Sequence, residues 1–183
     1  MAECKLRDQV LKELGESLSE ISMEDISGIG ELLMEGERIF CDAAGRSRLQ
    51  VEGFAMRLTQ MGLPARIVGD PTTPAITSKD ILLVCSASGE TPSLVEHAAK
   101  ARKLGVRILL VTAGEQSSLG HLSDDRVVIR AGSKKRQCTD SIQPMGSLFE
   151  QSLGLFLDMT VLYLMERYGI TSEEMRRNHS NLE

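Results

Sequence analysis

Five short, mostly apolar segments, alternating with helical ones, constrain the fold of this chain more than any other feature. They cover residues 38–43, 64–68, 81–85, 107–112 and 126–130. Strands that are apolar on both faces are typical of a parallel sheet whose two sides are covered by helices. The pattern therefore predicts an α/β fold, a three-layer α-β-α sandwich around a five-stranded parallel sheet.

The segments that flank these strands have helical periodicity. Before them, apolar residues recur at three- and four-residue steps, and Ser22 with Asp25 forms the pattern of a helix N-terminal cap. After them comes a long helix over residues 145–167 with apolar residues on more than one face, which suggests either a second copy as partner or a helix buried within the monomer. Thr171 can cap a last short helix. Residues 131–143 show no periodicity, and we expect them to form a surface loop.

The length of 183 residues suits one domain, because single domains usually run to ~100–200 residues. We expect a single domain over residues 1–183. An N-terminal helical arm (1–35) would precede an α/β core (36–143), and C-terminal helices (144–183) would follow it.

Charge and composition disfavour several functions. The net charge is −5 and the longest basic run is residues 134–136, so nucleic-acid binding, which requires neutralised phosphates, is not expected. Acidic residues interrupt the long apolar helix, which argues against a membrane span. The N-terminus lacks the apolar stretch of a secretory signal, which predicts a cytoplasmic protein. The four cysteines form no CxxC pair, so no zinc ribbon is expected. Cys41 and Cys85 lie inside apolar segments, and we expect them to be small buried hydrophobic residues.

A hydroxyl-rich loop follows the third strand and opens a helix. Ligands of doubly wound sheets bind beyond the carboxyl ends of the strands, so loops in this position are candidate sites. The loop offers its hydroxyls, a flexible glycine and the N–H groups of a helix N-terminus, which together suit a phosphate. Its candidate ligand groups are Ser86, Ser88, Gly89 and Thr91. The alternative is a plain strand-to-helix turn with ordinary capping.

Two further candidates lie at helix starts. Arg46 and Ser47 follow the first strand, where a forked guanidinium and a hydroxyl could bind an anion, or form only a tight turn. Glu150 lies near the start of the long apolar helix, where a lone carboxylate is costly unless it is solvated, paired or used. The alternative for Glu150 is an acidic residue favoured by the helix dipole. The glycines of a dinucleotide fingerprint and of the GxxxxGK[ST] phosphate loop are absent.

Several stretches together resemble a known family. They are Gly45-Arg46-Ser47, Ser86-Ala87-Ser88-Gly89-Glu90-Thr91, Gln143-Pro144-Met145-Gly146 leading to Glu150, and a late His179. The chain resembles the sugar isomerase (SIS) domain, whose fold is flavodoxin-like, and within it the 6-phospho-3-hexuloisomerase family of the ribulose monophosphate pathway. It departs from the family pattern at Ala43 and Arg48, where members usually or often have glycine.

The resemblance implies an isomerase that interconverts 3-hexulose 6-phosphate and fructose 6-phosphate through a cis-enediol, without metal or organic cofactor. It implies that Ser86, Ser88 and Thr91, with Ser47, hold the phosphate. Glu150 matches the catalytic base and His179 a residue that assists proton transfer. The family is typically homotetrameric with sites at subunit interfaces. A separate 3-hexulose-6-phosphate synthase is a functional partner in formaldehyde assimilation.

Two alternatives stay open at this point. One is another SIS-type phosphosugar isomerase, acting on a heptose or pentose phosphate, and the other is a non-catalytic phosphosugar-binding sensor. Geometry adds a condition, because a helix over residues 145–167 is about 33 Å long and His179 follows its far end. His179 reaches Glu150 only if the tail folds back or if a neighbouring subunit supplies it.

Overall fold

The computed structural model describes residues 3–114, 116–130 and 141–182. One sheet of five strands runs through it in the order β2-β1-β3-β4-β5, and every strand pairing is parallel. The strands are Ile39–Ala43 (β1), Ala65–Ile67 (β2), Ile81–Ser86 (β3), Arg107–Thr112 (β4) and Asp125–Val128 (β5). The five-stranded parallel sheet predicted from the apolar segments is confirmed.

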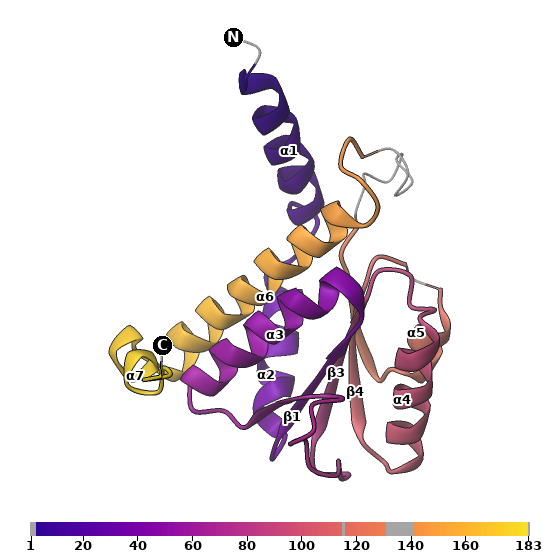
Figure 1. Cartoon of the computed structure of the whole chain (residues 1–183), viewed down its shortest axis with the longest axis vertical. Coiled ribbons are helices and arrows are strands. Elements are labelled where there is room, and N and C mark those ends of the chain that lie inside the picture. Colours follow the sequence, from indigo (N-terminus) through magenta and orange to yellow (C-terminus); the bar gives the residue numbers. More distant parts are fainter. Residues whose placement is uncertain (1–2, 115, 131–140, 183) are drawn as a thin grey trace.

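Helices cover both faces of this sheet, as Figure 1 shows. One core packs side chains such as Cys41 and Leu83 against α2, α3 and α6, and a second packs Phe40 and Leu82 against α4 and α5. The described helices are Glu3–Leu18 (α1), Met23–Glu35 (α2), Gly45–Gln60 (α3), Pro92–Lys103 (α4), Ser118–Leu122 (α5), Ser147–Tyr168 (α6) and Ser172–Arg177 (α7). The three-layer sandwich is therefore confirmed.

The predicted helix caps form where the sequence suggests. Ser22 accepts from the backbone N–H of Asp25 while the Asp25 carboxylate accepts from the Ser22 backbone. Thr171 and Glu174 make the same reciprocal pair at α7. Each pair satisfies N–H groups that a helix start leaves without intrahelical partners. The sequence analysis missed α5, which is only one turn long.

The long helix α6 serves as a core helix. By length and composition it could cross a membrane, with a mean hydropathy of 1.3, yet half of that window is buried inside the fold. Leu153 and Phe156 are fully buried, and α6 packs on α2 and α3. Leu155 and Leu162 remain exposed on its other side, in agreement with the predicted second apolar face.

The N-terminal helix α1 extends away from the sheet and packs on α6 (Figure 1). Leu6 and Leu11 on α1 are exposed. The surface loop predicted over residues 131–143 lies outside the described residues as far as 140.

Candidate active site

The candidate site lies where the strand order of the sheet reverses. The chain passes from β1 to its neighbour β2 and then returns to form β3 on the other side of β1. Ala43 at the end of β1 pairs in register with Cys85 of β3, so the loops that follow these two strands begin side by side. α3 starts from the first loop and α4 from the second, on opposite faces of the sheet. Ligands of open parallel sheets bind in the crevice at such a point.

Arg46 and Glu150 meet at this crevice. The Nε of Arg46 donates to Oε2 of Glu150 at 2.7 Å. Arg46 is in the first turn of α3 and its side chain is 64% exposed, whereas Glu150 is in the first turn of α6 and only 14% exposed. The ion pair links the start of α3 to the start of α6, and these two helices pack side by side. The carboxylate of Glu150 is thus paired, as a mostly buried carboxylate requires.

The other carboxylate oxygen of Glu150 is left available. No described residue donates a hydrogen bond to Oε1, which lies 3.6 Å from the position that a side chain at Gly146 would occupy. Gly146 is the N-cap residue of α6, so the carboxylate folds back over the start of its own helix. Met145, just before it, has φ of +58° and is 95% exposed, and α6 begins at Ser147, two residues later than predicted from the sequence pattern.

The hydroxyl loop closes on itself. Ser86 Oγ accepts from the Gly89 backbone at 3.2 Å and lies 3.4 Å from Thr91 Oγ1, while Ser88 Oγ accepts from the Glu90 backbone at 3.2 Å. Thr91 is the N-cap residue of α4, but its hydroxyl makes no cap hydrogen bond. It faces Ser86 instead, so three hydroxyls and two backbone N–H groups gather in one turn.

A second loop holds the hydroxyl loop in shape, and sequence reasoning missed it. The carboxylate of Glu90 accepts from both the backbone and the hydroxyl of Ser118, at 2.7 and 2.6 Å, and these bonds lower the pKa of Glu90. Gly89 O accepts from the backbone of Leu119 at 3.0 Å. These partners come from the start of α5, a helix too short to leave a periodic signal.

The N-terminal helix α1 holds the chain segment that leads into α6, the helix of Glu150. Glu13 of α1 is only 7% exposed, and its carboxylate accepts from the Ile142 backbone at 2.9 Å and from the Ser141 hydroxyl at 2.7 Å. Gln143 donates to the same carboxylate at 3.2 Å and accepts from Gln151 of α6 at 2.6 Å. A single buried carboxylate therefore fixes the segment that leads into the helix of Glu150.

Two neighbours of Arg46 face different ways. Ser47 is buried in the first turn of α3, beneath the loop that follows β1. Arg48 turns toward the end of β2, where it donates to Glu52 at 2.8 Å and to the carbonyl of Val68 at 3.1 Å. The guanidinium of Arg48, a residue that departs from the family pattern, is therefore hydrogen-bonded at the side of α3.

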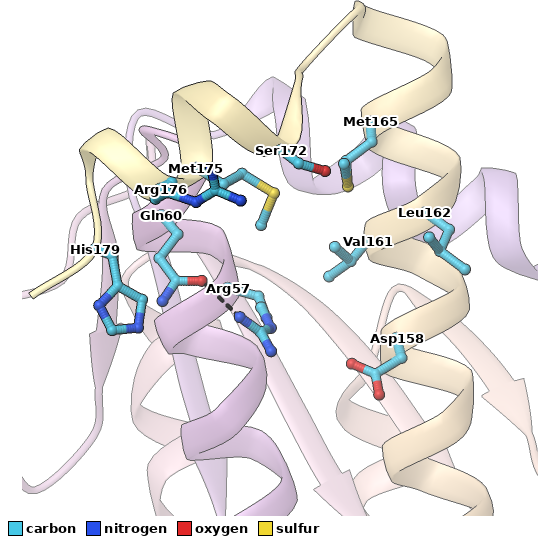
Figure 2. A pocket seen from close by; sticks show the side chains of 10 residues that line it. All are labelled: Arg57, Gln60, Asp158, Val161, Leu162, Met165, Ser172, Met175, Arg176 and His179. Atoms are coloured by element: carbon cyan, nitrogen blue, oxygen red, sulfur yellow. Dashed lines mark hydrogen bonds between the residues drawn. The ribbon is translucent and has the colours of Figure 1, made fainter.

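His179 lies at the opposite end of α3 from Arg46. Asn178, its neighbour, donates to the Gln60 carbonyl at 2.9 Å, and Gln60 is about 21 Å along the helix from Arg46. Figure 2 shows His179 beside Arg57 and Arg176 at a cavity of about 500 Å³ between α3, α6 and α7. Within one chain, the structure therefore does not bring His179 to Glu150.

The described residues offer no arrangement for a metal ion, since within 3–114, 116–130 and 141–182 no three His, Cys, Asp or Glu side chains gather as ligands. Cys41 and Cys85 are free and fully buried. Burial raises the pKa of Cys41 to about 12, which keeps its thiol protonated and unreactive. Both cysteines are the buried hydrophobes that the sequence suggested.

Comparison with known proteins adds a family and several relatives. The model of the SIS domain family matches residues 32–154 of this chain. A Bacillus subtilis protein named 3-hexulose-6-phosphate isomerase is 44% identical over 179 residues, or 96% of each protein. A Mycobacterium gastri protein of the same name is 36% identical over 175 residues, which cover 95% of this chain and 88% of that relative.

A solved structure agrees with these relatives. A Methanococcus jannaschii protein superposes with a TM-score of 0.84 at 26% sequence identity, over 98% of this chain and 99% of that one. The description of its crystal structure infers a molecular function of 3-hexulose-6-phosphate isomerase for that protein.

Proposed function

The chain belongs to the SIS domain family, and from this membership we propose that it is a 6-phospho-3-hexuloisomerase, which interconverts 3-hexulose 6-phosphate and fructose 6-phosphate. One structural observation supports the proposal and links it to particular residues. The Arg46–Glu150 ion pair, at 2.7 Å, lies at the same edge of the sheet as the loop of hydroxyls after β3. A carboxylate beside a phosphate-binding turn is what an isomerase of phosphosugars requires.

The phosphate of the substrate binds at the hydroxyl loop. Ser86, Ser88 and Thr91, with the Gly89 backbone, would exchange their 3.2–3.4 Å contacts with one another for stronger bonds to a doubly charged ligand. The N-terminal ends of α3 and α4 add favourable dipoles, and Ser47 of α3 lies in the first of them. Because the phosphate is remote from the reacting carbons, its binding energy serves to hold them in position.

Glu150 acts as the base. Its Oε1 removes the proton from C2 of the 3-ketose, and the electron pair of that C–H bond forms the C2–C3 double bond of a cis-enediolate. The carbonyl oxygen on C3 becomes the oxyanion and takes a proton. Return of the carbon-bound proton from Glu150 to C3, with loss of the proton on the C2 hydroxyl, gives fructose 6-phosphate. Arg46 holds Oε2, so that Oε1 is aimed at the adjoining carbons.

A second copy of the chain supplies His179. The developing oxyanion needs a hydrogen-bond donor, and His179 is about 21 Å from this site when measured along its own α3. We propose a homotetramer with sites at the subunit interfaces. The exposed Leu155 and Leu162 of α6 support a contact between copies, because they form an apolar second side on a core helix.

The physiological setting follows from the reaction. We propose that the enzyme acts in the cytoplasm, in the ribulose monophosphate pathway of formaldehyde assimilation, on the product of a separate 3-hexulose-6-phosphate synthase. Proton transfer by a carboxylate requires no metal and no organic cofactor, so we expect the rate to survive treatment with EDTA.

A coupled assay tests the function directly. Purified chain is given 3-hexulose 6-phosphate, and fructose 6-phosphate is detected through a linked dehydrogenase. Turnover supports the proposal. Turnover of a heptose or pentose phosphate alone would assign the chain to a different SIS isomerase, and binding without turnover of any ketose phosphate would make it a sensor.

The Glu150→Gln variant tests the base. It should still bind fructose 6-phosphate but should lose turnover, by about 10²-fold or more, because the amide cannot accept the C2 proton. Glu166→Gln, an exposed acidic residue on the same helix, is the matched control and should stay active. Near-normal turnover by Glu150→Gln would rule this base out.

A further inference from the structure

A second buried carboxylate lies beside the site, and the proposed mechanism does not use it. Asp42, the penultimate residue of β1, is only 2% exposed. Its Oδ2 lies 2.8 Å from Nδ1 of His97 on α4. Burial raises the pKa of Asp42, and the hydrogen bond to His97 opposes that rise. A carboxylate is retained in a core only when it is paired, so the contact with His97 is what makes this position tolerable.

The pair joins the two halves of the crevice. Four residues after Asp42 the chain reaches Arg46, which contacts Glu150. His97 is on the helix whose N-terminus closes the hydroxyl loop, about 7.5 Å along its axis from Pro92. Asp42 points to the α4 face of the sheet, since its neighbours Cys41 and Ala43 belong to the core on the other face. One hydrogen bond thus connects the strand of the Arg46 loop with the helix of the phosphate loop.

Apolar packing also joins β1 to α4, through Phe40. α4 packs mainly on α5, β3 and β4. The chain passes from β2 to β3 through residues 68–80 without a helix, and a cavity of about 190 Å³ remains there between α4 and β1. Its lining includes Phe40, Val68, Pro74, Ile76, Leu82 and His97. Beside this cavity, the Asp42–His97 hydrogen bond adds a directional contact that fixes α4 relative to β1.

We propose that Asp42 and His97 are positioning residues, which set the distance between the phosphate loop and the Arg46–Glu150 pair. This role rests on the proposed function, because it concerns one substrate that spans both places. The phosphate would be bound by its own loop with or without the pair. Only the alignment of the reacting carbons with Glu150 would depend on it, so the pair affects turnover rather than phosphate affinity.

The His97→Ala variant tests this role. We expect kcat for 3-hexulose 6-phosphate to fall about tenfold, while the inhibition constant of inorganic phosphate changes less than about twofold. His97→Asn should restore kcat to within about threefold of the wild type, because its amide N–H reaches the place of Nδ1. His121→Ala, which removes an exposed histidine from α5, is the matched control and should change neither quantity.

The double variant Asp42→Ala/His97→Ala keeps the test decisive if the single variant folds poorly. It removes both partners and leaves no unpaired buried carboxylate, so it should fold. Its kcat should also fall about tenfold from the wild type, since two residues that act through one contact are not additive. An unchanged kcat, a parallel loss of phosphate affinity, or a failure of Asn to restore turnover would each overturn the role. A wild-type chain without isomerase activity would overturn the proposed function, and this role with it.

Discussion

Gly89 and Gly62 both adopt positive φ, at +65° and +85°, yet their surroundings differ. A Cβ at Gly89 would lie 2.2 Å from Ser117 Oγ and 2.5 Å from Ser117 Cβ, whereas at Gly62 the nearest atom, on Asn178, is 3.9 Å away. At Gly62 only the backbone conformation favours glycine. At Gly89 the close approach of the two loops also requires it, so the shape of the hydroxyl loop depends on the absence of one side chain.

We predict different outcomes for alanine at these two positions. Both variants should lose about 1–2 kcal/mol of unfolding free energy, the cost of the left-handed conformation. Gly89→Ala should lose more, and should also weaken inorganic phosphate binding about tenfold, because Ser117 must move. Urea unfolding and phosphate inhibition measure the two effects. Equal phosphate affinity in the two variants would contradict this account of the loop.

Among the elements, α1 lies away from the sheet but still contacts the segment that leads to the candidate site. Glu13 holds the segment 141–143 through a backbone N–H and two side chains. That segment leads to Gly146, where α6 begins, and Gln143 is bonded to Gln151 of α6. The arm therefore helps to determine where the helix of Glu150 starts.

We predict that Glu13→Ala lowers kcat about fivefold, because the start of α6 loses its anchor, while phosphate inhibition stays within about twofold of the wild type. Glu16→Ala is the control, since Glu16 is on the same helix with a side chain that is 43% exposed. Circular dichroism would show that both variants fold. If the Glu13 variant turns over normally, α1 has no part in positioning Glu150.

At the amino-terminal end of the strands, opposite the candidate site, a different carboxylate holds the chain in place. Asp80, just before β3, has a fully buried side chain that accepts from Arg38 at 2.9 and 2.7 Å and from Thr77. Burial alone would raise the pKa of Asp80, but these hydrogen bonds and the Arg38 charge outweigh it, so the pKa is lowered. A lowered carboxyl pKa contributes stability above its unfolded value, and this contribution is lost as the pH falls through the folded value.

We predict that Asp80→Asn lowers the unfolding free energy by about 2 kcal/mol at pH 7. The difference from the wild type should shrink as the pH falls below about 4, where Asp80 of the unfolded chain begins to take up a proton, and should be lost as the pH falls through the lowered pKa of the folded chain. Urea unfolding at pH 7, 4 and 3 gives the comparison, with Asp8→Asn, whose side chain is 57% exposed, as the control. A difference that does not vary with pH would contradict the assignment.

For the whole molecule, the placement of His179 matters most. Glu150 and His179 are associated with opposite ends of α3, and the cavity beside His179 is separate from the crevice of Glu150. If both residues act in one reaction, the reaction needs two copies of the chain. Assembly would then be a condition of activity as well as a source of stability.

We predict that two inactive variants complement each other. Glu150→Gln and His179→Gln, co-expressed with different tags and purified through both, should recover about a quarter of the wild-type rate, because some interfaces combine both intact residues. Glu150→Gln co-expressed with the double variant should recover nothing. Recovery absent from both mixtures would place Glu150 and His179 of each active site in the same copy of the chain, and a fully active His179→Gln variant would remove His179 from the mechanism.

The sequence by itself determined the sheet, the layers and the two loops of the crevice. Each of these features depends on residues that are close together in the sequence. A strand buried on both faces is apolar at every position, and a helix cap such as Ser22 with Asp25 joins residues three positions apart. The positions of Arg46 after β1 and of the hydroxyl loop at the end of β3 followed from the same pattern. Cys41 and Cys85 were recognised as buried for the same reason.

Only the tertiary structure decided which side chains meet. Arg46 and Glu150 are 104 positions apart, Glu13 and Gln143 are 130 apart, and Asp42 reaches His97 from another element. The periodicity of the sequence does not predict such contacts, because they depend on how whole helices pack on the sheet. The same packing carries His179 away from Glu150, and a tail that follows a long rigid helix can be located only when the direction of that helix is known.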